Sequence, residues 1–302
     1  MASDFENQVR ATNEKINAQV KATNDKINER TGRPLIRAIV VGLALGGGLL
    51  ISLLVVKELY MLFAAVLIAF VTYELASAMR LAGRRVPRPV TIVAAVAVVP
   101  ATFYWHDEGH WWVTLGGIAV ISLWRLVELA RPSARASARN VLLDLGAGAF
   151  IMVYVAFMAG FTVLLTAQEG GQWWTLAFLI VVVCVDTGAY AAGLTFGKHL
   201  MAPAISPKKT WEGFAGSVAA AMIAGILLAL FMLHQPWWVG VILAIVMVFT
   251  ATLGDLAESL IKRDLGIKDI SSFLPGHGGF LDRLDSALLS GAAAYALFLI
   301  FA

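Results

Sequence analysis

Long apolar segments, one after another, limit what this chain can fold into. A helix needs about 20 predominantly apolar residues to cross the roughly 30 Å hydrocarbon core of a bilayer. The candidate spans are 35–56, 59–79, 89–105, 111–129, 140–166, 172–196, 212–234, 237–259 and 284–301. Only 14% of the residues are charged, whereas a soluble domain is nearer 25%. The sequence therefore predicts an all-α polytopic membrane protein with about nine transmembrane helices, forming one domain over residues 34–302.

The polar N-terminal region, residues 1–33, is predicted to be a helical leader. The segments QVRATNEKINA and QVKATNDKINE follow one another there with an 11-residue offset. The spacing of the apolar residues puts them on one stripe of an amphipathic helix: Val9, Ile16, Val20 and Ile27. Two interpretations stay open, a helix that binds a partner or the membrane interface and a solvated, partly frayed leader. The leader has no apolar h-region, so no cleavable signal peptide is expected.

The charges on the links predict how the helices are oriented. The links that carry several Lys or Arg residues are 80–88, 131–139, 197–211 and 260–283, whereas 106–110, 167–172 and 234–236 carry none. Lys57 alone breaks this alternation. Because basic links stay in the cytoplasm, the N-terminus is expected inside and the C-terminus outside the cell (inner) membrane. Trp pairs at 111–112, 173–174 and 237–238 open even-numbered spans at the outer end, as an aromatic belt would.

Some ionisable residues lie inside apolar segments, where charges are costly. Asp186 lies in span six, and two interpretations stay open, an Asp that binds a neighbouring helix and a wall of a substrate cavity. Structural roles are favoured for four others towards the cytoplasmic ends of their spans: Glu74, Arg125, Glu128 and Asp144. The single cysteine, Cys184, gives neither a disulfide framework nor a thiol metal site.

The segment SPKKTWEG, residues 206–213, is the first dense polar motif. Ser206 and Pro207 favour a bend, and Lys208, Lys209 and Thr210 come just before an apolar helix. Cations and hydroxyls at a helix start, beside free backbone N–H groups, favour phosphate binding. The alternative is a basic loop with a helix cap.

The segment from Gly254 to Asp285 is the second and richer motif. Its side chains at i, i+3, i+4 and i+7 share one helix face: Asp255, Glu258, Ser259 and Lys262. Asp282 and Asp285 share a face at the start of the last span. Carboxylates without cysteine favour oxygen ligation, which suits Mg²⁺ beside substrate phosphates. The alternative is an interfacial salt-bridge loop.

These motifs resemble the phosphatidate cytidylyltransferase (CDP-diacylglycerol synthase) family. The resemblance rests on D-x-x-A-Y at Asp186, on SPKKTWEG at 206–213, on GDLAES at 254–259, and on the stretch from Ser259 to Asp285 that contains LPGHGG and DRLD. It covers residues 180–290 well, which marks the expected catalytic part. Spans one to five match only as hydrophobic helices, and the leader is not part of the pattern.

The resemblance implies transfer of CMP from CTP to phosphatidate, which gives CDP-diacylglycerol and pyrophosphate in phospholipid synthesis. Mg²⁺, with a second cation as an option, would be held by Asp255, Asp282 and Asp285. The expected catalytic residues are Asp255, Asp282, Lys262, Arg263, His277 and Asp186. The expected substrate-binding residues are Ser206, Lys208, Lys209, Thr210, Lys268, Arg283, Glu258 and Ser259.

The expected partners are therefore CTP, phosphatidate and bilayer lipid, with no nucleic acid, and a homo-oligomer is left open. Two other functions remain as alternatives. One is a CTP-dependent transferase that acts on another lipid phosphate or on a lipid alcohol. The other is an ion-coupled membrane transporter, which would pair intramembrane charges across structural repeats; the nine spans show no such repeat in sequence.

Overall fold

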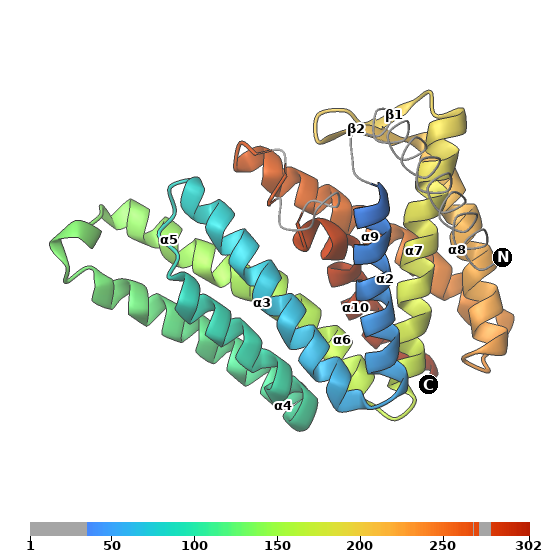
Figure 1. The fold of residues 1–302 in the computed structure, drawn as a ribbon, viewed down its shortest axis with the longest axis horizontal. Coiled ribbons are helices and arrows are strands. Elements are labelled where there is room, and N and C mark those ends of the chain that lie inside the picture. Colours follow the sequence, from blue (N-terminus) through green and yellow to red (C-terminus); the bar gives the residue numbers. More distant parts are fainter. Residues whose placement is uncertain (1–34, 268, 272–278) are drawn as a thin grey trace, which may run out of the picture.

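The computed structural model describes residues 35–267, 269–271 and 279–302, and nearly all of them are helical (Figure 1). The elements are α2 (Leu35–Leu54), α3 (Lys57–Leu81), α4 (Arg88–Glu128), η1 (Pro132–Ala134), α5 (Ala138–Ile151), η2 (Met152–Phe157), α6 (Met158–Ala167), α7 (Gly171–Phe196), β1 (Leu200–Ala202), β2 (Ser206–Thr210), α8 (Trp211–Phe231), α9 (Trp237–Asp264) and α10 (Leu281–Phe301). The predicted leader at 1–33 lies outside the described residues.

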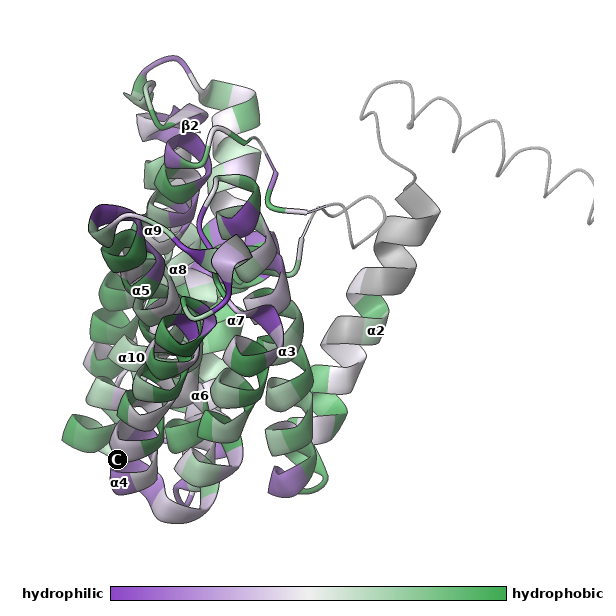
Figure 2. Ribbon diagram, turned by 90° about the vertical axis from the view of Figure 1, so that its left-hand side faces the viewer, coloured by the Kyte–Doolittle hydropathy of each residue, from purple (hydrophilic) through white to green (hydrophobic). Residues whose placement is uncertain are grey.

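Seven helices among the described residues are long and apolar enough to cross a membrane, counting α5, η2 and α6 as one run. The chain is therefore a multi-pass membrane protein. Figure 2 shows hydrophobic residues along the lengths of the helices and hydrophilic residues gathered at their ends. The largest concentration of hydrophilic residues lies at the end that carries β2.

Helix α4 is 41 residues long but is not straight. At His106 the backbone takes φ 49° and ψ −132°, which reverses its direction. The two arms lie side by side, because a Cβ on Gly117 would come within 3.3 Å of the Cβ of Ala94. The arms coincide with the two apolar segments that the sequence separates at 106–110 (Figure 1).

A buried ion pair joins the second arm of α4 to α5. Arg125 Nη2 lies 2.9 Å from Asp144 Oδ2, and both side chains are nearly inaccessible to solvent. The other Asp144 oxygen accepts a hydrogen bond of 2.8 Å from the backbone N–H of Arg85, before α4. Glu128 instead accepts a hydrogen bond from Trp124. Arg125 and Asp144 therefore join α4, α5 and the link between α3 and α4, as the structural interpretation of both residues expects.

Glycines bring helices α7 to α10 into close contact. A Cβ on Gly188 would lie 2.7 Å from the Gly216 carbonyl oxygen, so α7 and α8 touch through their backbones. Gly225 and Gly240 do the same for α8 and α9. Small residues at helix contacts are typical of membrane bundles, where close packing replaces the hydrophobic effect. These four helices form the frame of the polar cavity described below.

The prediction of an all-α fold is wrong at one place. Strand β1 pairs antiparallel with β2, and β2 is the segment Ser206–Thr210 that the sequence predicts as a bend before a helix. Glu212, in the first turn of α8, accepts hydrogen bonds from the backbone N–H groups of Lys198 and His199. These bonds fold the chain back before α8 begins. Between His199 and α8, the β1–β2 hairpin pairs backbone N–H and carbonyl groups with one another.

Candidate active site

A polar cavity of about 470 Å³ lies among α7, β2 and the ends of α8, α9 and α10. This volume is within the roughly 300–1,000 Å³ of small-molecule sites. Its lining includes most of the side chains that the sequence singles out: Asp186, Ser206, Lys208, Lys209, Thr210, Asp255, Glu258, Lys262, Asp282, Arg283 and Asp285. Three separate parts of the sequence therefore meet in one place.

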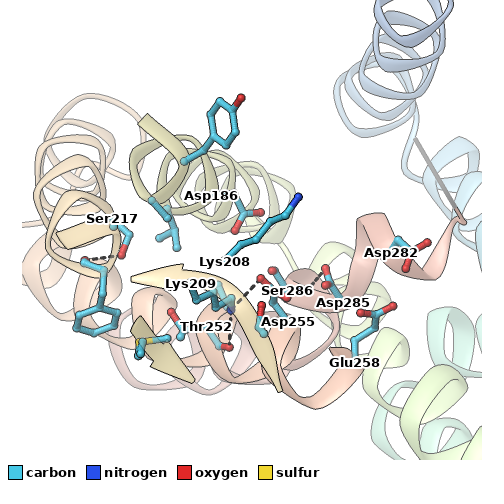
Figure 3. Close-up of a pocket in the computed structure, with 18 of the residues that line it drawn as sticks. Asp186, Lys208, Lys209, Ser217, Thr252, Asp255, Glu258, Asp282, Asp285 and Ser286 are labelled. Atoms are coloured by element: carbon cyan, nitrogen blue, oxygen red, sulfur yellow. Dashed lines mark hydrogen bonds and ion pairs between the residues drawn. The ribbon is translucent and has the colours of Figure 1, made fainter. Parts of the chain in front are cut away.

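Lysines of β2 enter this cavity opposite the carboxylates of three helices. Figure 3 shows Asp186, Asp255 and Asp285 around the space that Lys208 and Lys209 enter. Lys209 Nζ lies 2.8 Å from Asp255 Oδ2 and 3.4 Å from the carbonyl oxygen of Thr252. Lys209 and Asp255 remain partly open to solvent, at 21% and 36% exposure, so a ligand can reach both.

A second charged group, less exposed to solvent, lies between α9 and α10. Lys262 Nζ is 2.5 Å from Glu258 Oε2 and 3.1 Å from Asp282 Oδ1. Asp282 Oδ2 accepts a hydrogen bond of 2.7 Å from the backbone N–H of Gly279. Glu258 is almost completely buried, and its Oε1 has no hydrogen-bond partner among the described residues. One lysine thus binds two carboxylates from neighbouring helices.

The close approach of α9 and α10 explains why their carboxylates meet. A Cβ on Gly254 would lie 2.4 Å from the carbonyl oxygen of Asp285, so only glycine fits there. Asp255 follows Gly254 directly, which brings it next to the turn of α10 that carries Asp285. Asp285 Oδ1 accepts a hydrogen bond from the backbone N–H of Ser286 at 2.7 Å.

Two candidate residues lie beside the cavity rather than in its lining. Arg263 donates from Nε to the carbonyl oxygen of Ile205, in the hairpin turn, at 3.3 Å. Ser259 donates to Asp255 Oδ1 at 3.4 Å. Arg263 therefore holds the hairpin and Ser259 contacts a lining carboxylate. Lys268 and His277 lie outside the described residues.

Thr210 caps a helix and also faces the cavity. It is the N-cap of α8, and its Oγ1 accepts a hydrogen bond of 3.1 Å from the backbone N–H of Gly213. It also lines the cavity. The cap starts α8 at Trp211, directly after β2, the strand that carries the two lysines.

Some lining residues received no site role from the sequence, among them Tyr190, Thr252 and Asp269. Tyr190 and Asp269 lie within the family motifs, and Thr252 does not. Helical spacing signals two of them, because Tyr190 lies four residues after Asp186 and Thr252 lies three before Asp255. Asp269 follows a predicted phosphate-binding lysine and lies on no helix, so no periodic signal predicts where its side chain goes.

The cavity is rich in both signs of charge, with more acid than base. Its ionisable lining comprises Asp186, Asp255, Glu258, Asp269, Asp282 and Asp285, with Lys208, Lys209, Lys262 and Arg283. Among the described residues, no three His, Cys, Asp or Glu side chains already converge as a metal site. The donors nevertheless fit a hard divalent cation in kind, because they are carboxylates, whose oxygens such cations prefer.

Fold and site together define a multi-pass helical membrane protein with a charged cavity at one end of its helices. Residues 36–301 match the cytidylyltransferase family. The chain is 40% identical over 271 residues to proteins named phosphatidate cytidylyltransferase from Mycobacterium bovis and Mycobacterium tuberculosis. These alignments cover 88% of this chain and 89% and 83% of the relatives. A protein of the same name from Staphylococcus epidermidis is 34% identical over 231 residues, 75% of this chain and 84% of its own length.

The chain therefore belongs to the cytidylyltransferase family, and it is an enzyme, a nucleotidyltransferase. The resemblance that the sequence motifs indicate is confirmed, and it extends beyond residues 180–290. The match includes the first spans, which the motifs alone did not connect to the family.

Proposed function

We propose that this protein transfers CMP from CTP to phosphatidate, giving CDP-diacylglycerol and pyrophosphate. A phosphatidate oxygen attacks the α-phosphorus of CTP, and the bond from that phosphorus to the pyrophosphate oxygen breaks. The main support is the cavity that gathers Lys208, Lys209, Lys262 and Arg283 beside carboxylates at one end of apolar helices. The names of the relatives point to the same reaction.

The residues suit this chemistry because the reaction needs positioning more than proton transfer. The phosphate of phosphatidate is already an anion, so little general-base help is required. The difficulty is to bring two polyanions together and to stabilise charge on the leaving pyrophosphate. The lysines of β2, with Lys262 and Arg283, would bind phosphate oxygens, and Ser206 and Thr210 would orient them. Lys268 and His277 are expected to join them.

Mg²⁺ fits the acidic side of the cavity, and a second cation is an option. Asp255 and Asp282 would hold it, with Asp285 and Asp186 as further candidates. When bound, the ion would neutralise phosphate charge and act as a Lewis acid. In the structure Asp255 and Asp282 are paired with Lys209 and Lys262. Each lysine would then bind a substrate phosphate while its carboxylate holds the cation, so that neither charge is left unpaired.

We further infer nine membrane crossings, formed by α2, α3, the two arms of α4, the α5–α6 run and α7 to α10. The basic links would face the cytoplasm by the positive-inside rule, in the inner membrane. The cavity lies at the end that carries the basic β2 hairpin (Figure 2). CTP would then enter from the cytoplasm while the acyl chains of phosphatidate stay in the bilayer.

The decisive experiment measures pyrophosphate release by purified protein with Mg²⁺, CTP and phosphatidate. Wild type should be active, and Asp255→Asn and Asp282→Asn should each lower kcat by at least about a hundredfold, because the metal would lose a charged ligand. Asp107→Asn, in the link at the far end of the helices, serves as the matched control and should retain activity. Full activity of Asp282→Asn would refute its metal-binding role.

A panel of lipids distinguishes the proposed reaction from CTP-dependent transfer to other lipids. Phosphatidate should be used in preference to other lipid phosphates and to lipid alcohols. Preferred use of a lipid alcohol would assign the cavity to a different CTP-dependent transferase. Ion flux in liposomes without CTP would instead support a transporter.

A further inference from the structure

Glu74 of α3 lies outside the family motifs, yet it contacts the segment that precedes the active-site helix α10. The side chain is buried, with 1% of its surface exposed. From the described residues its carboxylate accepts three hydrogen bonds, from Ser271 Oγ at 2.5 Å and from the backbone N–H groups of Phe280 and Leu281 at 3.0 Å each. The sequence predicted only a structural role near the membrane interface.

Two further contacts tie α3 to the same place. Phe70, one helical turn before Glu74, stacks on Phe280 with ring centroids 4.7 Å apart and an interplanar angle of 12°. A Cβ on Gly279 would lie 2.8 Å from Glu74 Oε2, so the carboxylate approaches the backbone closely. Carboxylate and ring together hold residues 279–281.

These contacts replace a helix cap. The first N–H groups of a helix have no partner within it, and a side chain of the N-cap residue usually accepts from one of them. In α10 the N-cap is Phe280, whose side chain cannot accept a hydrogen bond. Glu74 supplies the acceptor from another helix, and its negative charge lies at the favourable end of the helix dipole.

The start of α10 carries two of the proposed ligands of the site. Asp282 lies in its first turn, and Asp285 follows one turn later on the same face. Asp282 also accepts from Gly279, one of the residues that Glu74 touches. A shift or fraying of this turn would therefore move both carboxylates relative to Asp255 on α9.

We infer that Glu74 is a positioning residue of the active site, which holds the first turn of α10 so that Asp282 stays at Lys262 and Asp285 stays beside Asp255. The inference rests on the proposed function, because it assigns Glu74 a role in that reaction. Among the described residues, the hydrogen-bond partners of Glu74 are Ser271, Phe280 and Leu281, and none of them lines the cavity. It acts through α10 and is not itself catalytic.

The test compares full-length Glu74→Gln with two matched variants. Gln keeps the length of the side chain but replaces one accepting oxygen with an NH₂ group that opposes a backbone N–H. Thr72→Val is the local control, since Thr72 is buried on the same helix and its hydroxyl has no hydrogen-bond partner among the described residues. Asp144→Asn is the stability control, since Asp144 is a buried carboxylate that also accepts from a backbone N–H, far from the cavity.

Two readouts decide the matter: hydrogen exchange at the amides of Phe280 and Leu281, and the steady-state kinetics with Mg²⁺ varied. Glu74→Gln should exchange at least about tenfold faster at these amides, because a lost charge-assisted hydrogen bond weakens local structure by that order. It should also lower kcat by about 10–100-fold and raise the Mg²⁺ concentration for half-maximal rate, as outer partners of metal ligands do. Thr72→Val should match wild type in both readouts.

Asp144→Asn should lose thermal stability without a change in the Mg²⁺ dependence. Phe70→Leu leaves the carboxylate intact and should change the exchange rates and the kinetics in the same direction as Glu74→Gln, but by less. If Glu74→Gln does not fold, Phe70→Leu takes its place in the test. Unchanged exchange at Phe280 and Leu281 would show that Glu74 does not hold this turn. Faster exchange with wild-type kcat and Mg²⁺ dependence would overturn the positioning role. An inactive wild type would contradict the proposed function alone, because hydrogen exchange still tests whether Glu74 holds the first turn of α10.

Discussion

Two of the basic residues that line the cavity, Lys209 and Lys262, already bind carboxylates, and this pairing bears on how substrates enter. Lys209 bridges Asp255 and the Thr252 carbonyl, and Lys262 bridges Glu258 and Asp282. A buried charge is costly unless it is paired. These ion pairs compensate the charges of the cavity and place the lysines where incoming phosphates would bind.

Lys209 is the side chain for which this exchange predicts the clearest kinetic effect. Lys209→Ala should lower kcat/KM for CTP by about 10–100-fold, because a hydrogen bond to a charged group contributes roughly 1.5–3 kcal/mol. Lys198→Ala is the matched control, an exposed lysine of the same link that does not line the cavity. An equal loss in both variants would mean that the link needs only general positive charge, and the specific role of Lys209 would fail.

Neighbouring residues show the limit of sequence reasoning at this scale. Lys262 and Arg263 are adjacent basic residues in one motif, and both were expected to contact substrate. Successive residues of a helix point about 100° apart, so they cannot share a face. The structure turns Lys262 into the cavity and Arg263 toward the carbonyl of Ile205. Spacing shows that the two diverge, but only the packing of α9 decides which one faces inward.

Helices approach one another most closely at glycines around the cavity. Gly254 brings α9 against α10, and Gly188 with Gly216 brings α7 against α8. Each contact is next to a lining carboxylate, since Asp255 follows Gly254 and Asp186 lies two residues before Gly188. The distances between carboxylates therefore depend on backbone contacts that any larger side chain would push apart.

Gly254→Ala tests this dependence. The added Cβ would meet the carbonyl oxygen of Asp285 at 2.4 Å, so the helices must separate. Displacing a catalytic group by about 1 Å can cost about a hundredfold in rate, and we expect a loss of that order in pyrophosphate release with the protein still folded. Gly146→Ala on α5, where a Cβ meets nothing within 4 Å, should keep wild-type activity. Activity of Gly254→Ala equal to that of Gly146→Ala would show that the close contact is dispensable.

In the whole molecule, links of different charge lie at opposite ends of the helices. The links after α3 and α4 and the hairpin β1–β2 lie toward the upper and left edge of Figure 1. The turn within α4, the links before α7 and α9, and the C-terminus lie along the lower edge. The first group is rich in arginine and lysine, so the three-dimensional arrangement agrees with the alternation of charge along the sequence.

The orientation inferred from this alternation can be measured with single cysteines. In a Cys184→Ala background, Glu169→Cys should react with a membrane-impermeant maleimide in sealed spheroplasts. Arg135→Cys should react only after lysis, because positive-inside orientation leaves its link in the cytoplasm. Both positions are exposed in the structure, so accessibility of the side chain does not limit labelling. The reverse pattern would place the cavity on the outer face and contradict the proposed entry of CTP.

The sequence by itself determined that this chain crosses a membrane many times, where its polar motifs lie and which family it belongs to. Apolar length, charge alternation and short motifs are local properties of a chain, so they can be read without coordinates. Only the tertiary structure decided that SPKKT forms a strand, that Arg263 turns away from the cavity, and that Glu74 holds the start of α10. These facts depend on contacts between residues as far apart as 74 and 281, and no periodic pattern records which distant side chain will meet a given backbone group.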